Sequence, residues 1–203
     1  PVVTGLAAAN TLTLNGNVTV NPSSMSAVIG TITLNLGSAA RTFDVAAGGA
    51  TPDLNLSGPV TNGGITKTGV GVLQLGNNAA GNNFAGGITV NAGTVRVTNA
   101  NDPGYLGATA NPITLNGGRL LVDQGGGTAR PLTVAANGGI LEVPLTGVTL
   151  STGLQGPGNL ALNGAATVTL SAAANASRTG TTTINAGTLT VTNLTALGTG
   201  AVT

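Results

Sequence analysis

Apolar and polar residues alternate in short runs along the whole chain. In GGITVNAGTVRVTN (86–99), isoleucine or valine occupies every second position on each side of a central Asn-Ala-Gly. Alternation with a period of two, in segments rich in β-branched residues, predicts β-strands with one buried face. Similar runs, bounded or split by Asn-Gly, Gly-Gly or Ala-Gly, lie at 11–20, 30–36, 72–75, 112–122, 131–143, 159–170 and 182–193. Because no window of eleven residues shows a helical period with caps, the pattern predicts an all-β chain.

The Asn-Ala-Gly at 91–93 changes which side chains of this stretch face the interior. Before it, the apolar residues occupy even-numbered positions (88 and 90), and after it they occupy odd-numbered positions (95 and 97). A corner explains this change, because Asn and Gly accept the left-handed backbone conformation that reverses side-chain direction. We therefore expect Arg96 to point outward, where a single charge costs little. The side chains expected inside are Ile88, Val90, Val95 and Val97.

Three landmarks occur twice in the same order along the chain. They are GVGVLQL (69–75) and GPGNLAL (156–162), Asn-Ala-Gly at 91–93 and 185–187, and a phrase ending in Leu-Gly at 104–107 and 195–198. A finer repeat is also present, because Asn-Gly-Gly occurs at 116–118 and again at 137–139, and Gly-Ile occurs at 64–65 and again at 87–88. A short period of this size, made of strands and tight turns, is typical of one rung of a β-solenoid.

The predicted architecture is a right-handed parallel β-helix, or β-solenoid, with rungs of about 20–25 residues. Each strand would pair with the equivalent strand of the next rung, about 4.8 Å away. We expect residues 1–203 to form a single solenoid segment of roughly nine rungs within a longer repeat protein, with the best repeat matches at 63–122 and 154–203. A β-sandwich is the alternative, because it also has short strands at regular spacing. It would need a larger aromatic core, whereas the aromatic residues here are Phe43, Phe84 and Tyr105.

Composition narrows the class of protein further. Charged residues make up 5% of the 203 residues, aromatic residues 1% and hydrophobic residues 41%, and 34 residues are glycine. A disordered chain would be more polar, and no apolar stretch reaches the length of about 18 residues that would span a membrane. The absence of cysteine excludes disulfides and thiolate metal sites. The cationic side chains are spread singly, so we expect isolated solubilising charges and no nucleic-acid binding. They are Arg41, Lys67, Arg96, Arg119, Arg130 and Arg178.

Residues that could carry out catalysis are few. Some parallel β-helices act on polysaccharides, and acid–base chemistry on sugars needs two carboxylates at a defined separation. Histidine is absent, and the acidic residues are Asp44, Asp53, Asp102, Asp123 and Glu142. The separation of Asp123 and Glu142 along the chain is close to one rung, so they could stack on neighbouring rungs near Arg119 or Arg130. The other interpretation is that Asp123 is a carboxylate in a loop and that Glu142 occupies an outward position of a strand. We favour it and expect no catalytic residue and no enzymatic activity.

Two binding hypotheses also follow from the pattern. Calcium-binding coils repeat Gly-Gly-x-Gly-x-Asp, which no aspartate here follows, and Asp102 before Pro103 suits a turn. We therefore expect no metal site and no cofactor. Thr-x-Thr rows on a flat solenoid face can match the lattice of ice or of another crystal. Only two pairs of triplets are spaced to lie on adjacent rungs, and threonine is also a good strand residue. The pairs are 11–13 with 31–33 and 167–169 with 188–190.

Residues 67–108 read KTGVGVLQLGNNAAGNNFAGGITVNAGTVRVTNANDPGYLGA. This stretch resembles the autotransporter-associated β-strand repeat. That repeat has Lys-x-Gly-x-Gly-x-Leu-x-Leu, an Asn-rich loop with an aromatic residue, Gly-Gly-Thr-x-Val-x-Ala-Gly-Thr-Leu, and then Ala-Leu-Gly. The matching positions are Lys67, Gly69, Gly71, Leu73, Leu75, Asn82, Asn83, Phe84, Gly86, Gly87, Val90, Ala92, Gly93, Leu106 and Gly107. In the second copy (155–198), Gln155 replaces the lysine and SAAANASRTG replaces the aromatic loop.

The resemblance implies a passenger region of a secreted or surface-displayed bacterial protein, folded as a right-handed parallel β-helix. We expect a non-catalytic stalk, or an adhesive or matrix segment, located outside the cell or on the bacterial surface. The phrase at 193–203 stops where its earlier counterpart continues into a strand, so the last rung would be an open template for pairing. Expected partners are other copies of the chain, which could associate into fibres, neighbouring solenoid repeats, or a host or matrix surface. We expect no nucleic acid and no insertion of this segment into a membrane. The alternatives are a polysaccharide-acting β-helix enzyme and an ice- or crystal-surface-binding solenoid.

Overall fold

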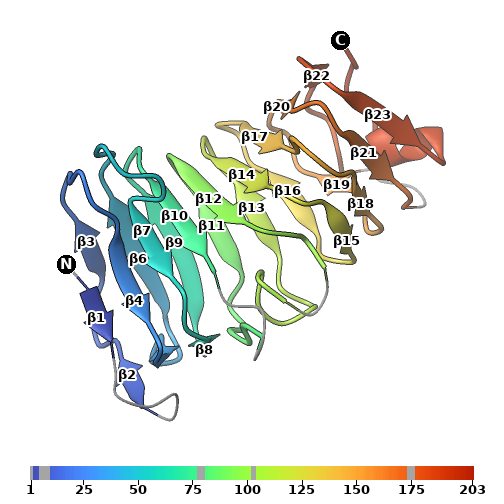
Figure 1. The fold of residues 1–203 in the computed structure, drawn as a ribbon. Coiled ribbons are helices and arrows are strands. Elements are labelled where there is room, and N and C mark those ends of the chain that lie inside the picture. Colours follow the sequence, from blue (N-terminus) through green and yellow to red (C-terminus); the bar gives the residue numbers. More distant parts are fainter. Residues whose placement is uncertain (1, 5–9, 77–80, 102–103, 173–176) are drawn as a thin grey trace.

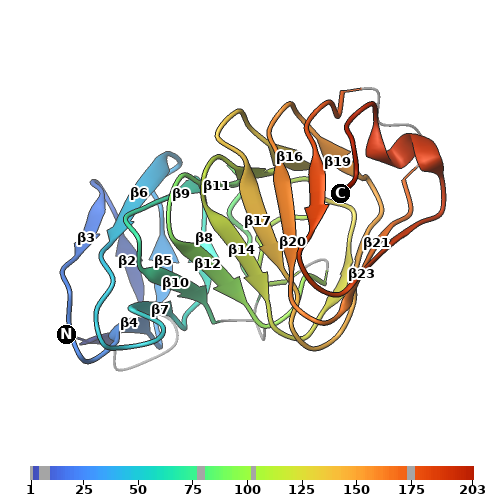
Figure 2. The ribbon, with the colours of Figure 1, turned by 90° about the horizontal axis from the view of Figure 1, so that it is seen from above.

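The strands stack in sequence order into a β-solenoid of about eight turns (Figure 1). The computed structural model describes residues 2–4, 10–76, 81–101, 104–172 and 177–203. Every ladder between two named strands is parallel, and neighbours in a sheet come from successive rungs. The N-terminal and C-terminal parts of the chain lie at opposite ends of the stack (Figure 2). The solenoid prediction is therefore confirmed, and the β-sandwich is wrong because a sandwich is built from antiparallel strands.

Four parallel sheets form the walls of the solenoid. The nine-stranded sheet contains β1 (Val2–Thr4), β4 (Ala27–Gly30), β7 (Leu54–Leu56), β10 (Val72–Leu75), β12 (Thr94–Val97), β14 (Arg119–Val122), β17 (Gly139–Glu142), β20 (Leu160–Asn163) and β22 (Thr182–Ile184). The seven-stranded sheet contains β3 (Val18–Val20), β6 (Ala40–Val45), β9 (Gly64–Thr68), β11 (Ile88–Val90), β13 (Ile113–Leu115), β16 (Leu132–Val134) and β19 (Leu154–Gln155).

The third wall consists of two separate sheets. The three-stranded sheet near the N-terminus contains β2 (Thr11–Thr13), β5 (Thr33–Asn35) and β8 (Val60–Thr61). The four-stranded sheet near the C-terminus contains β15 (Gly126–Thr128), β18 (Val148–Leu150), β21 (Thr167–Leu170) and β23 (Thr188–Val191). Between them, the described parts of 76–87 and 98–112 carry no strand of this wall. A short 3-10 helix, η1 (Leu194–Leu197), follows β23.

The rungs differ in length more than the sequence pattern predicts. In the nine-stranded sheet, Leu54 pairs with Ala27 of the preceding rung and with Leu73 of the next one, so the first of these rungs is much longer than the second. Both fall outside the predicted range of about 20–25 residues. Loops lengthen or shorten between walls while the strands stay stacked, because the entropic cost of a longer loop grows slowly.

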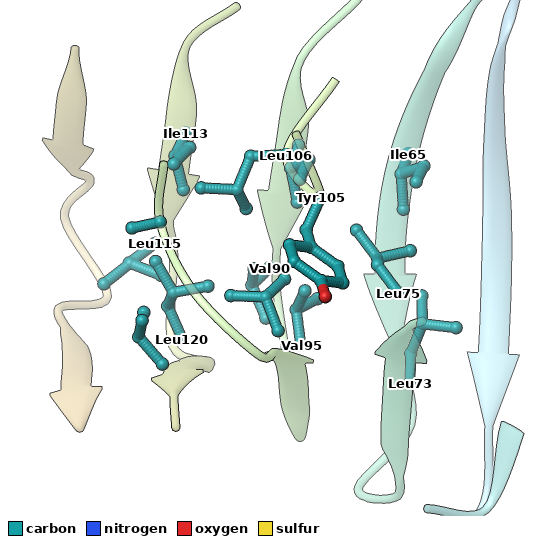
Figure 3. Packing of buried hydrophobic residues seen from close by; sticks show 14 of the residues in the cluster. Ile65, Leu73, Leu75, Val90, Val95, Tyr105, Leu106, Ile113, Leu115 and Leu120 are labelled. Atoms are coloured by element: carbon teal, nitrogen blue, oxygen red, sulfur yellow. The ribbon is translucent and has the colours of Figure 1, made fainter. Parts of the chain in front are cut away.

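Aliphatic side chains form columns inside the walls (Figure 3). Leu73, Val95 and Leu120 pair in register on β10, β12 and β14, and each is at most 3% exposed. Tyr105 and Leu106 join the same buried core from the loop where the third wall has no described strand. Stacked columns of this kind bury apolar surface on every rung, which is the main stabilising contribution in such a fold.

The corner at 91–93 is confirmed, and glycine alone accounts for its left-handed conformation. The four side chains predicted inside, Ile88, Val90, Val95 and Val97, are at most 2% exposed. Gly93 has φ +64°, whereas Asn91 is not among the residues with positive φ. Asn91 instead accepts a hydrogen bond from Asn116 Nδ2 at 3.0 Å, so its side chain joins two rungs.

The two Asn-Ala-Gly phrases occupy different corners of the solenoid. The first, at 91–93, leads from β11 of the seven-stranded sheet to β12 of the nine-stranded sheet. The second, at 185–187, leads from β22 of the nine-stranded sheet to β23 of the four-stranded sheet. Both corners have a left-handed glycine, Gly93 and Gly187. The same phrase therefore encodes a strand–corner–strand unit, and not a particular wall.

Candidate functional site

Four charged side chains form two ion pairs on the nine-stranded sheet. Arg96 Nε donates to Asp123 Oδ2 at 2.8 Å, and Arg119 Nη1 donates to Glu142 Oε2 at 2.7 Å. In each pair the carboxylate comes from the rung after the arginine, since β12 pairs with β14 and β14 with β17. The four side chains are between 22% and 39% exposed, so both pairs lie at the outer surface.

These ion pairs determine the surroundings of the two carboxylates considered for catalysis. Glu142 pairs in register with Leu121, two residues before Asp123, so the two carboxylates occupy different positions across the sheet. Each is bound to its own arginine, and the Arg130 expected nearby is buried elsewhere. Asp123 follows the end of β14 and Glu142 ends β17 in an outward position. This geometry favours the interpretation of Asp123 as a loop carboxylate and Glu142 as an outward strand position, and it adds an ion pair to each.

The other described carboxylates bind groups of the chain itself. Asp53 is only 6% exposed, and its two oxygens accept backbone N–H groups of Gly48 at 2.6 Å and Val72 at 2.8 Å. Asp44 is exposed and accepts a hydrogen bond from the Thr68 hydroxyl at 3.1 Å. Asp102, expected to form a turn, lies outside the described residues, as does Pro103.

The prediction of isolated solubilising cations is wrong for half of them. Lys67, Arg130 and Arg178 are fully buried, with an exposed fraction of 0%. Backbone carbonyl oxygens surround them at corners and loops, and hydrogen bonds to those oxygens offset the cost of removing a charge from water. Arg96 and Arg119 are held in the ion pairs, and Arg41 Nε donates to Leu36 O at 2.7 Å. The sequence contains no local signal for this burial, because each cation also needs carbonyl oxygens from a neighbouring rung.

Lys67 lies in an inward position of the seven-stranded sheet, in register with Phe43 and Val90. Its ammonium donates to the carbonyl oxygens of Thr68 and Gly69, the latter at 2.7 Å, and to that of Ala92 at 3.3 Å. Burial lowers the pKa of Lys67 from 10.5 to about 8, although the charges of Asp44 and Asp53 act in the opposite direction.

The two buried arginines bind carbonyl groups in the same way. Arg130 reaches the preceding rung, where its guanidinium donates to Ala108 O and, at 2.7 Å, to Gly107 O. Arg178 Nη1 donates to the carbonyl oxygens of Gly156, at 3.1 Å, and Gly158. Burial lowers the pKa of Arg178 from its ordinary value. Both side chains therefore connect residues about one rung apart in sequence.

Both predicted pairs of threonine triplets lie on adjacent rungs, but only one pair is in register. The triplets 167–169 and 188–190 pair in register, but 11–13 pairs with 33–35, so Thr13 faces Asn35. A longer row, which does not follow the Thr-x-Thr pattern, occupies one position on five successive strands of the seven-stranded sheet. It consists of Thr42, Thr66, Thr89, Thr114 and Thr133. The signal in the sequence is an Ile-Thr or Leu-Thr dipeptide that recurs once per rung for the last four of these threonines, whereas Thr42 follows Arg41.

A cavity of about 370 Å³ lies near the N-terminal end of the core. Residues of β3, β4 and the segment between them line it, among them Val18, Val20, Met25 and Ile29. The described lining residues have no ionisable side chain. The cavity therefore offers apolar surface and no group for acid–base catalysis.

Within the described ranges, no three His, Cys, Asp or Glu side chains are grouped so that they could hold a metal ion. No helix in the same ranges is long and apolar enough to cross a membrane.

The parallel sheets and the columns of the core define a β-solenoid repeat protein. Residues 65–97 and 155–191 match the family model of the passenger-associated-transport-repeat. The two matching stretches confirm the resemblance to autotransporter passenger repeats, and together with the fold they fit a surface-associated passenger segment. Comparisons with curated proteins and with solved structures find no match.

Proposed function

We propose that this segment is a non-catalytic structural rod of a passenger exposed outside the cell, and that copies of it associate side by side in adhesive or matrix structures. One observation carries the proposal: the described charged groups bind the chain itself. The carboxylates accept hydrogen bonds from N–H groups, a hydroxyl or arginines, and the three buried cations bind carbonyls. Such groups stabilise stacked rungs and leave no acid–base pair directed at a substrate.

The outer face of the seven-stranded sheet supports lateral association. From β9 to β19, its outward positions carry small or medium uncharged side chains, which let a second flat sheet approach without charge repulsion. These residues are Thr66, Thr68, Thr89, Thr114, Thr133 and Gln155. The nine-stranded sheet differs, because its outer face carries the two ion pairs. Charges facing outward on a sheet disfavour sheet-to-sheet aggregation.

Sedimentation equilibrium over a range of concentrations tests lateral association. We expect the average mass to rise with concentration for the natural chain. Thr89→Lys combined with Thr114→Lys, in the middle of the threonine face, should restore a monomer because like charges then meet. Gln74→Lys places a charge on the nine-stranded sheet and serves as the matched control. A monomer at every concentration, or equal disruption by the control, would contradict association through this face.

Activity assays test the non-catalytic part of the proposal. The segment should leave acidic polysaccharides unchanged in chain length. Cleavage that disappears in Asp123→Ala and persists in Asp44→Ala would instead support a polysaccharide-acting enzyme.

A second candidate function is binding to ice or to another crystal surface. The five-threonine row favours it, because strand spacing places the hydroxyl groups about 4.8 Å apart. Growth of ice crystals in the presence of the protein is the test. Slower growth that is lost in Thr89→Leu and kept in Thr169→Leu would support this candidate over lateral association.

A further inference from the structure

Lys67 and Arg178 belong to the same inward column of the seven-stranded sheet. The paired residues of this column are Val18, Phe43, Lys67, Val90, Leu115 and Val134. Gln155 pairs with Thr133, so Gly156 continues the column, and an isolated parallel bridge joins Gly156 to Arg178. Five strand spacings, or about 24 Å, separate the two cations. A column that is otherwise apolar or glycine therefore contains two buried charges.

Each of these cations binds the corners of two successive rungs. The Lys67 ammonium binds Thr68 O and Gly69 O in the corner that follows its own strand, and Ala92 O in the corner of the next rung. Because an ammonium has three donors and no acceptor, these three carbonyls satisfy it completely.

Arg178 makes the corresponding connection in the opposite direction along the rod. Its Nη1 binds Gly156 O and Gly158 O, in the corner of the preceding rung. Its Nη2 binds Thr181 O at 2.9 Å and Thr182 Oγ1 at 3.3 Å, in its own rung. Gly156 and Gly158 correspond to Gly69 and Gly71 in the repeated Gly-x-Gly landmark. Both copies of the repeat therefore have a buried cation at this corner. In the first copy the same rung supplies it, as Lys67, and in the second copy the following rung supplies it, as Arg178.

Glycines leave the space that both cations occupy. A Cβ on Gly93 would lie 2.8 Å from Nζ of Lys67, and a Cβ on Gly180 would overlap Nη1 of Arg178. Each Cβ would come closer still to carbonyl oxygens that line the corner, namely Gly69 O and Gly71 O at Gly93 and Gly158 O at Gly180. Real Cβ atoms do not approach other atoms this closely, so any other residue at either position would displace the cation or these carbonyls. The cation and its glycine thus form one unit in each repeat.

We propose that Lys67 and Arg178 are cross-rung clamps, positioning residues that hold the corner of one rung against the corner of the next. The apolar column alone does not distinguish one rung from another, since valine and leucine recur on successive strands. A buried cation does distinguish them, because only one register places enough carbonyl oxygens around it. This role concerns the interior of the rod, and it does not depend on lateral association.

Amide hydrogen exchange at each corner tests the clamps. Asn91 N donates to Lys67 O and Thr94 N to Gly71 O, so these amides report on the Lys67 corner. Thr179 N donates to Gly156 O and Leu160 N to Thr181 O, so these report on the Arg178 corner. Lys67→Met, which keeps the length of the side chain, should speed exchange at least tenfold at the first pair only. Arg178→Met should do so at the second pair only.

Arg96→Met is the matched control, because it removes a cation from the outer surface of the same rungs. It should leave all four amides as protected as in the natural chain. Unchanged protection in Lys67→Met, or an equal loss in Arg96→Met, would overturn the proposal. Loss of protection at both corners in either clamp variant would also overturn it, since the two clamps would then not act locally.

A measurement on the natural chain covers the case in which the variants do not fold. Lys67 is the only lysine in the sequence, so a 15N-lysine label reports on its ammonium alone. A buried, hydrogen-bonded ammonium exchanges its protons slowly, so its N–H protons should be detected near neutral pH at room temperature. An ammonium that exchanges at the rate of free lysine would contradict the clamp.

Discussion

The position that a Cβ on Gly93 would take lies 2.8 Å from Nζ of Lys67, although the two residues belong to different rungs. The same Cβ would also approach the carbonyl oxygens of Gly69 and Gly71. The corner of one rung and the cation of the preceding rung are therefore packed as a unit. The free energy of unfolding should therefore depend both on Gly93 in the corner and on the Lys67 ammonium.

Gly93→Ala should be strongly destabilising. Alanine in the left-handed conformation costs about 1–2 kcal/mol, and the new methyl group must displace the ammonium or the carbonyls around it. We expect the free energy of unfolding, measured by urea denaturation, to fall by more than about 2 kcal/mol. Gly127→Ala is the control, because a Cβ there meets nothing within 4 Å, and it should change stability by less than about 0.5 kcal/mol. Equal effects of the two substitutions would contradict the packing described.

Asp53→Ala should also destabilise the fold. The substitution removes the acceptors of the backbone N–H groups of Gly48, which is exposed, and Val72, which is half-buried, at a cost of about 1–3 kcal/mol in total. Asp53→Asn keeps one acceptor oxygen, so its effect should be about half as large. Asp44→Ala removes an exposed carboxylate and should have little effect on the midpoint of thermal unfolding. If Asp44→Ala and Asp53→Ala lower the midpoint equally, the role assigned to Asp53 is incorrect.

Stability should rise with pH between about 8 and 10.5. The pKa of Lys67 is about 8 in the folded chain and 10.5 when unperturbed, so in this window the unfolded chain binds a proton that the folded chain does not. The free energy of unfolding therefore increases with pH, by up to about 3 kcal/mol. Urea denaturation at several pH values measures this increase. Lys67→Met should lack it, and identical pH profiles for the two proteins would refute the lowered pKa.

The outer ion pairs should contribute little to stability. A double-mutant cycle with Arg119→Ala and Glu142→Ala should give a coupling energy of about 0.2–1 kcal/mol, because exposed pairs are well solvated. The coupling should weaken in 1 M salt, where the Debye length falls to about 3 Å. A coupling above about 2 kcal/mol, or one that does not respond to salt, would mean that the pair is less accessible to solvent than its exposure indicates.

The sequence predicted the local features of the fold well. The alternation around 91–93 placed Ile88 and Val90 inside before the corner, and the buried residues of β11 confirm this. The Gly-Ile dipeptides at 64–65 and 87–88 predicted a pairing that the structure contains, Ile65 with Ile88. These predictions succeeded because a strand with one buried face and a corner with a left-handed glycine are both encoded within a few residues.

The candidate sites were predicted less well. Asp123 and Glu142 lie on adjacent rungs as expected, and the predicted Arg119 binds Glu142, but Arg96 and not Arg130 binds Asp123. Lys67, Arg130 and Arg178 were expected at the surface and are buried. In both cases the outcome depends on partners in a neighbouring rung, and corners of variable length determine which residues meet.

The sequence by itself determined that the chain is a stack of short strands with aliphatic residues inside and glycine at the corners. It did not determine which wall each strand joins, since the same Asn-Ala-Gly phrase turns between different sheets at 91–93 and at 185–187. Only the tertiary structure decided this, and with it the places where a cation can be buried. The physical reason is that a strand–corner–strand unit has the same local energy on any wall. A buried charge, in contrast, is stabilised only when carbonyl groups from two rungs bind it at once.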